Sequence, residues 1–132
     1  MLTGHNIEPE VLAIAKKVRS WAEEKALEWE FPSDLMGMCA IASAKLHESL
    51  KHEGFPSKIG YNPDNCFVIY KGFVLDVTAT KFKEEEPVMV ARRNDYWFHN
   101  EEHVFADVVN LKRIQRQHRW PRSQRVTRML EE

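Results

Sequence analysis

The sequence predicts an α+β domain in which helices pack on a small antiparallel sheet. Two segments near the N-terminus, 9–29 and 38–52, repeat apolar residues at helical spacing. Short runs of β-branched and aromatic residues then fill 57–92, and helical spacing returns over 101–118. Because the strands follow one another as a group and do not alternate with helices, an antiparallel sheet is favoured over a parallel one.

Both N-terminal helices carry recognisable start or stop signals. Pro9 suits the first turn of a helix, where its missing N–H costs no hydrogen bond. Pro32 disfavours a helical residue before it and so closes the first helix. The second helix is expected to stop at Gly54, with Pro56 just beyond. Each boundary is therefore predicted by local backbone chemistry.

The middle of the chain is predicted to form strands. The runs 66–70 and 73–77 are separated by Lys71 and Gly72, which favours a tight hairpin. Segments 57–61 and 88–92 are further strand candidates. We expect a C-terminal helix over 101–118, because Phe105 and the apolar residues after it recur at helical intervals.

Composition indicates one globular domain spanning 1–132, with its core within about 9–118 and a basic tail at about 112–132. Of 132 residues, 43% are hydrophobic and 30% charged, as in folded proteins. No apolar run approaches the about 18 residues of a membrane span, and the N-terminus lacks a signal-peptide pattern. Two cysteines without metal-ligand spacing predict neither a disulfide framework nor a zinc site, so a cytoplasmic location is expected.

The net charge of −1 conceals a basic segment at 112–128. It holds seven basic side chains and no acidic one, namely Lys112, Arg113, Arg116, Arg119, Arg122, Arg125 and Arg128. A solvated surface that balances an acidic body is the simplest interpretation. The alternative is a docking surface for an acidic partner. Nucleic acid is not expected, because Trp120 is the only aromatic residue there and no RNA-binding signature is present.

Cys39 stands where a glycine-containing segment turns into the second predicted helix. The positive end of the helix dipole and the first-turn N–H groups favour a thiolate at this position. The same N–H groups can hold an oxyanion when a thiolate attacks a carbonyl. Taken alone, a cysteine at this position is also compatible with a small hydrophobic core residue.

Asp76 interrupts the apolar run 73–77, where a carboxylate is costly unless it is paired or functional. A hairpin centred on Lys71 and Gly72 brings the strand that contains Asp76 beside the strand that begins at Asn65. We therefore expect positions near 65 and 76 to face each other across the ladder. Cys66 should point to the opposite face of its strand and pack in the core.

The segments "GMCAIASAKLHESLKHEGFPSKI" and "NCFVIYKGFVLDVTATKF" resemble the transglutaminase-like branch of the papain-like cysteine proteinases. The resemblance covers about residues 33–82 and rests on three separated pieces in the right order. It implies that Cys39 is the nucleophile, that Asp76 is the orienting acid, and that the position of the catalytic histidine falls on Asn65. It also implies a papain-like, transglutaminase-like core.

Asn65 departs from the family pattern, because an asparagine side chain cannot accept a proton near neutral pH. Three explanations remain open: a degenerate relative that binds without cutting, a deliberate replacement of a natural histidine, or a different histidine entering the site. The other candidates are His5, His47, His52, His99, His103 and His118. Packing or surface roles are expected for all six, since His47 and His52 lie far along the helix from Cys39.

The sequence thus predicts cysteine-dependent acyl transfer to, or hydrolysis of, an amide: a peptide bond, an isopeptide bond or a glutamine side chain. The catalytic residues would be Cys39, Asn65 and Asp76, with Asn65 marking an inactive form, and no cofactor or metal is implied. The partner would be a protein or peptide substrate, with no membrane involved. The alternative is a catalytically degenerate binding module that docks an acidic partner through 112–128.

Overall fold

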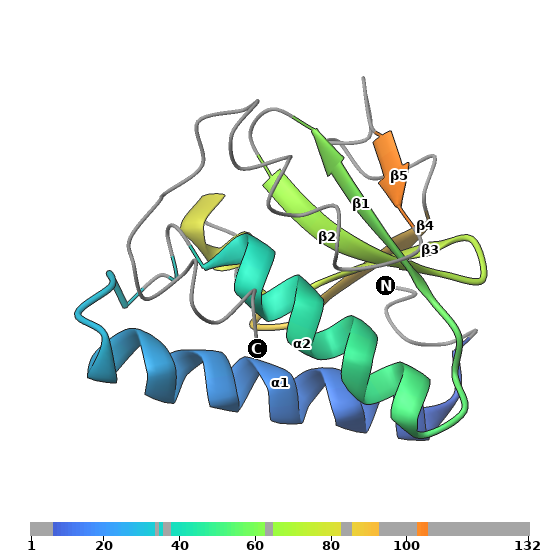
Figure 1. The fold of residues 1–132 in the computed structure, drawn as a ribbon, viewed down its shortest axis with the longest axis horizontal. Helices are drawn as coiled ribbons and strands as arrows, with labels where there is room; N and C mark the ends of the chain where they lie inside the picture. The colour runs from blue at the N-terminus through green and yellow to red at the C-terminus, as the bar shows by residue number, and fades with distance from the viewer. Residues whose placement is uncertain are drawn as a thin grey trace.

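The computed structural model describes residues 7–33, 35, 38–62, 65–82, 86–92 and 103–105. Within them the chain forms a mixed α+β fold in which helices cover one face of a five-stranded antiparallel sheet (Figure 1). The elements are α1 (Pro9–Glu28), α2 (Cys39–His52), β1 (Lys58–Asn62), β2 (Asn65–Tyr70), β3 (Phe73–Asp76), the 3-10 helix η1 (Ala79–Phe82), β4 (Met89–Arg92) and β5 (His103–Phe105). The predicted α+β class is confirmed.

Both helices begin and end close to their predicted boundaries. Pro9 occupies the first turn of α1, and Glu30, with φ of 63°, turns the chain out of the helix. The Phe31 N–H then donates to the Ala26 carbonyl at 2.8 Å, as in a Schellman closure. Gly54, with φ of 87°, follows α2 in the left-handed conformation that glycine adopts without steric cost.

The hairpin between β2 and β3 forms at the predicted residues. Lys71 and Gly72 have φ of 48° and 81°, and two positive φ values are what a type I′ turn requires. The register pairs Tyr70 with Phe73 and Val68 with Leu75. This register decides which residues of the two strands share a face.

The sheet has two chemically different faces. Val68, Tyr70 and Leu75 join the main core together with the apolar sides of α1 and α2. The alternate positions Phe67 and Ile69 belong to a second, smaller core cluster on the other face; Val74 completes it, with Met89 and Ala91 packed against it. Alternation along each strand therefore separates the helix-covered face from the opposite one.

The sheet order is β4-β3-β2-β1-β5, and every neighbouring pair is antiparallel. β5 lies at the edge beside β1, with Gly60 opposite Val104. The predicted C-terminal helix is therefore wrong at 103–105, because strand pairing with β1 overrides the helical spacing of these residues. The remainder of the predicted helix lies outside the described residues.

Candidate functional site

Cys39 is the first residue of α2 and only 5% exposed. Leu46 and Leu50 follow it at about two and three helical turns, so the three residues share one line along the helix. Both leucines belong to the main core, which α1, α2 and the sheet form together. Cys39 therefore continues the core-facing line of α2 at its N-terminal end.

The start of α2 lies level with the start of β2. The two elements run in the same direction (Figure 1). Phe55 connects the C-terminal end of α2 to the C-terminal end of β2. Its N–H donates to the Leu50 carbonyl of α2 at 2.8 Å, and its ring packs edge-on against Tyr70 of β2, with 6.3 Å between the ring centroids. Cys39 precedes Leu50 by about 16 Å of helix, and Asn65 precedes Tyr70 by about 16 Å of strand. The thiol-bearing residue and position 65 are thus brought to the same end of the fold.

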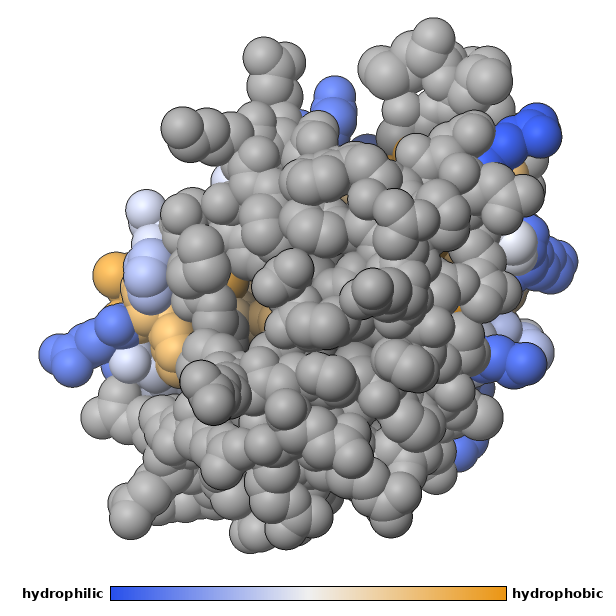
Figure 2. Space-filling model, turned by 90° about the horizontal axis from the view of Figure 1, so that it is seen from above, coloured by the Kyte–Doolittle hydropathy of each residue, from blue (hydrophilic) through white to orange (hydrophobic). Residues whose placement is uncertain are grey.

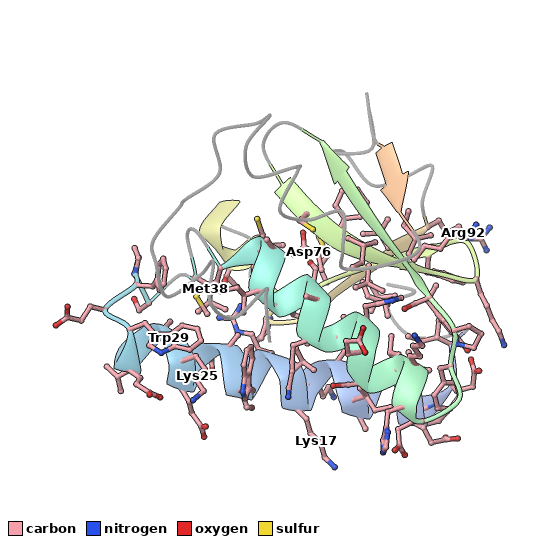
Figure 3. The ribbon with its side chains drawn as sticks, viewed as in Figure 1. Lys17, Lys25, Trp29, Met38, Asp76 and Arg92 are labelled. Atoms are coloured by element: carbon pink, nitrogen blue, oxygen red, sulfur yellow. The ribbon has the colours of Figure 1, made fainter. Side chains whose placement is uncertain are left out.

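Asp76 is the last residue of β3 and is 1% exposed. Continuing the register from Val68 and Leu75 sets Asp76 opposite Phe67, so Asn65 is two positions away along the neighbouring strand. The side chain of Asn65 lies outside the described part of the structure. Figure 3 shows Asp76 at the end of the sheet where α2 begins.

Alternate residues of β2 belong to opposite faces of the sheet, so Cys66 and position 65 belong to different faces. Cys66 is fully buried and belongs to the same face as Val68, which the helices cover. Position 65 belongs to the same face as Phe67, which the continued register sets opposite Asp76. A meeting between Cys39 and residue 65 would therefore take place around the end of β2, at its first residue, and not across the middle of the strand.

The Asp76 carboxylate ends β3 by forming an Asx turn. Its Oδ1 accepts hydrogen bonds from the Thr78 N–H at 2.9 Å and from Thr78 Oγ1 at 3.3 Å. These bonds offset part of the cost of burying a carboxylate. Asp76 consequently has a structural role in the turn, in addition to any role in chemistry.

The entry to α2 contains a strained residue. Leu35 is fully buried and has φ of 68°, a conformation that costs a side-chain-bearing residue about 1–2 kcal/mol. Its N–H donates to the Pro32 carbonyl and its carbonyl accepts from the Met38 N–H, both at 3.0 Å. Strain of this kind is often found beside functional sites, and here it directs the chain into Cys39.

Arg19 of α1 is a buried guanidinium that the sequence analysis did not identify. It is 7% exposed. Its Nη1 donates to the Val77 carbonyl at 3.0 Å, to Thr80 Oγ1 at 2.8 Å and to the Pro87 carbonyl at 3.4 Å. Its Nε bonds the Glu23 carboxylate at 2.9 Å. Arg19 thus ties α1 to the segment that directly follows Asp76.

A signal for Arg19 was present in the sequence. Arg19 lies four residues after Ala15 and three before Ala22, on the line of small residues that α1 buries. An arginine on the buried face of an amphipathic helix needs acceptors from another element. The sequence could therefore indicate that Arg19 has partners, although not which ones.

A second polar contact ties the start of α1 to the β2–β3 hairpin. Glu8 Oε2 accepts hydrogen bonds from the Tyr70 hydroxyl and from Lys71 Nζ, the latter at 3.2 Å. The Tyr70 hydrogen bond, more than the Lys71 ammonium, lowers the pKa of Glu8. Burial first, and then the Glu8 carboxylate, raises the pKa of Tyr70. This contact lies at the opposite end of β2 from Asn65.

The described histidines have structural or surface roles. His47 is buried in α2, with Nδ1 2.9 Å from Ser57 Oγ. His52 is exposed and lies 3.8 Å from the Glu53 carboxylate. The side chain of His103 and the whole of His5, His99 and His118 lie outside the described residues. The expectation of a packing or surface role therefore holds for His47 and His52.

A groove of about 730 Å³ lies between the two helices, lined by Ile14, Lys17, Val18, Trp21, Lys45, Glu48, Ser49, His52 and Glu53. Lys45 Nζ lies 5.2 Å from the centre of the Trp21 ring. The groove carries charges of both signs and contains neither Cys39 nor Asp76. It is therefore separate from the candidate site.

Apolar surface is present at the end of the molecule where α1 stops and the chain turns toward α2 (Figures 1 and 2). Leu27 is 84% exposed, and Trp29 and Phe31 are partly exposed beside the core.

Among the described residues, no helix is long and apolar enough to cross a membrane. No group of three acidic, histidine or cysteine side chains in that part of the chain could hold a metal ion. The basic segment 112–128 lies outside it. No known protein family, characterised protein or solved structure matches this sequence or fold.

Proposed function

We propose that this chain carries the site of a cysteine-dependent acyl-transfer enzyme of the transglutaminase-like, papain-like type, with Asn65 in the position of the base. One observation supports this most strongly: the start of α2, the start of β2 and the end of β3 meet at one end of the fold, and they carry Cys39, Asn65 and Asp76. These are the three positions that the sequence resemblance selects. The substrate class is an amide of a protein or peptide.

The chemistry would begin with loss of the Cys39 thiol proton to a base at position 65. Sγ then attacks the amide carbonyl carbon, and the first-turn N–H groups of α2 stabilise the oxyanion. The C–N bond breaks as the base returns the proton to the leaving nitrogen, which leaves a thioester on Cys39. Water or a second amine then attacks the thioester carbon and regenerates the thiol.

Asn65 cannot carry out the proton transfers in this scheme, because its amide neither takes up nor releases a proton near neutral pH. We therefore propose that the chain is an inactive form of such an enzyme as it stands. The role of Asp76 would be to accept a hydrogen bond from an imidazole at position 65 and hold it in one tautomer.

The second candidate is a binding module that kept the fold and lost the chemistry. Two observations favour it: Asn65 itself, and the Asx turn that gives Asp76 a structural reason to be retained. Its docking surface would be the basic segment 112–128, with an acidic protein as the partner.

Asn65→His tests the proposal. The single variant is compared with Asn65→His combined with Asp76→Asn, because asparagine keeps an oxygen acceptor for Thr78 but loses the negative charge. The readout is the rate at which iodoacetamide alkylates Cys39 between pH 5 and 9, mapped by mass spectrometry. Hydrolysis or amine exchange of glutamine-containing peptides is measured on untreated portions of the same preparations.

We expect Asn65→His to raise the Cys39 alkylation rate at pH 6, since an imidazole with an ordinary pKa near 6.5 forms an ion pair with the thiolate. Adding Asp76→Asn should remove most of this gain. If the Cys39 alkylation rate of the single variant is unchanged across this pH range, the triad is rejected and the binding module becomes the preferred function. A raised rate without turnover of these peptides supports the nucleophile and rejects glutamine-containing peptides as the substrate.

A further inference from the structure

We propose that Arg19 is the positioning residue of this site: from α1 it fixes the turn after β3 and thereby the orientation of the Asp76 carboxylate. The inference rests on the proposed function. Arg19 touches neither Cys39 nor Asp76 in any contact described above. It acts through the backbone that leaves β3.

The contacts of Arg19 surround that turn. Its Nη1 bonds the carbonyl of Val77, the residue directly after Asp76, and the hydroxyl of Thr80 at the start of η1. It also reaches the Pro87 carbonyl, two residues before Met89, which pairs with Asp76 in the sheet. One guanidinium group therefore holds both the segment that leaves β3 and the segment that enters β4.

The Asx turn completes the arrangement. Thr78 donates twice to Asp76 Oδ1, so the carboxylate cannot rotate without moving the backbone at Thr78. That backbone lies between Val77 and Thr80, the two residues that Arg19 holds. The carboxylate is thus connected rigidly to α1 through the turn.

Arginine is the side chain suited to this task. Its guanidinium is always charged, planar and rich in donors, so it can bind several acceptors from one buried position. Lysine offers a single ammonium with no fixed plane, and methionine fills similar space without any donor. The Glu23 carboxylate balances the charge through Nε, which leaves Nη1 to bond Val77, Thr80 and Pro87. Three acceptors held by one buried nitrogen indicate a fixed geometry in this part of the chain.

The expected consequence is on chemistry more than on folding. A displacement of about 1 Å in a catalytic group can cost about 100-fold in rate. Loosening the 76–80 turn should allow the Asp76 carboxylate to drift away from an imidazole at position 65. The thiolate–imidazolium pair would then be less favoured at pH 6.

The test uses the full chain in the Asn65→His background. Arg19→Met removes every donor, and Arg19→Lys keeps a charge with a different geometry. Glu8→Gln is the matched control, because Glu8 also ties α1 to the sheet but bonds the hairpin at the far end of β2. For each variant the Cys39 alkylation rate is measured from pH 5 to 9, together with the thermal midpoint.

We expect Arg19→Met to lower the pH 6 rate gain roughly tenfold, an intermediate loss in Arg19→Lys, and less than a twofold change in Glu8→Gln. If the pH–rate profiles of Arg19→Met and Glu8→Gln are indistinguishable, the inference is overturned, whatever the thermal midpoints of the two variants. If Arg19→Met does not fold, the test uses Thr80→Val, which removes one acceptor of Arg19. A reduced rate gain at pH 6 in this variant supports the inference, and an unchanged gain rejects it.

The two proposals fail in different ways. If Asn65→His alone does not raise the Cys39 alkylation rate, the proposed function is wrong and so is the positioning role of Arg19. If Asn65→His produces the gain and the Arg19 variants retain it, only the positioning role is wrong.

Discussion

Cys39 and Cys66 are both buried thiols near the same end of the fold, but they occupy different chemical surroundings. Cys39 lies at a helix N-terminus, where the dipole and the backbone N–H groups favour a thiolate. Cys66 is the second residue of β2, the central strand of the sheet, and is fully buried. This difference decides which of the two is expected to react.

We expect iodoacetamide near pH 7 to label Cys39 in the native protein before Cys66. Peptide mapping by mass spectrometry after partial reaction gives the two rates directly, and the urea-unfolded protein, in which both should react alike, is the control. Preferential labelling of Cys66 would count against Cys39 as the nucleophile.

Two substitutions separate the charge of the Asp76 carboxylate from its part as a hydrogen-bond acceptor. Asp76→Ala leaves the Thr78 N–H and hydroxyl without their acceptor, and a buried unsatisfied donor costs about 1–3 kcal/mol. Asp76→Asn keeps the oxygen and should cost clearly less. Urea unfolding of both variants checks this. Equal losses would mean that the Asx turn contributes little and that the charge matters instead.

At the level of single residues, the sequence predicted Cys39 at a helix start and a buried Asp76, because helix-capping patterns and apolar runs are local. It did not predict Arg19 or its acceptors. Val77, Thr80 and Pro87 come about 60 residues later in the chain. Contacts between residues so far apart depend on packing that no local pattern contains.

Among the elements, the β2–β3 hairpin depends on its two left-handed residues. Gly72 has φ of 81° and open space where a Cβ would lie, so any penalty for Gly72→Ala comes from the backbone alone. We expect a loss of about 1 kcal/mol, and a smaller loss for Gly72→Asn, since asparagine adopts this conformation more readily. Denaturant titration of both variants tests this. Alanine tolerated as well as asparagine would contradict the turn geometry.

The contact between α1 and the hairpin predicts how stability depends on pH. The pKa of Glu8 is lowered from its ordinary 4.5, so its contribution is present above pH 4.5 and is lost as the pH falls through the lowered value. The raised pKa values of Tyr70 and Lys71 mean that their contributions are present below about pH 10 and are lost above it.

Wild type and Glu8→Gln should therefore differ in thermal midpoint at neutral pH, and the difference should shrink below about pH 4. Midpoints measured at intervals from pH 3 to 9 give this comparison. A difference that persists unchanged at pH 3 would show that the carboxylate charge is not the cause.

The failure at β5 has a clear physical reason. The spacing of apolar residues predicts a helix at His103–Phe105, but three residues are too few to distinguish the helical period of about 3.6 residues from the strand period of two. Pairing with β1, more than 40 residues earlier, decides their conformation. The α1, α2 and hairpin predictions succeeded because proline, glycine and apolar periodicity act within each segment.

For the whole molecule, the order of helices and strands was sufficient to predict the α+β class. It did not predict the sheet order, in which β5 crosses to the edge beside β1. The sequence did predict that Cys66 and position 65 belong to opposite faces and that Cys66 is buried, because alternation is a local property of a strand. The sheet order follows from register and packing across the entire domain.

The proposed function requires Cys39 and residue 65 to meet at the end of β2. A crystal structure of the Asn65→His variant measures this directly, as the distance between Cys39 Sγ and the nearer ring nitrogen of the introduced imidazole. We predict a separation of about 3–4 Å, with the Asp76 carboxylate bonded to the other ring nitrogen. A separation beyond about 8 Å would contradict the triad.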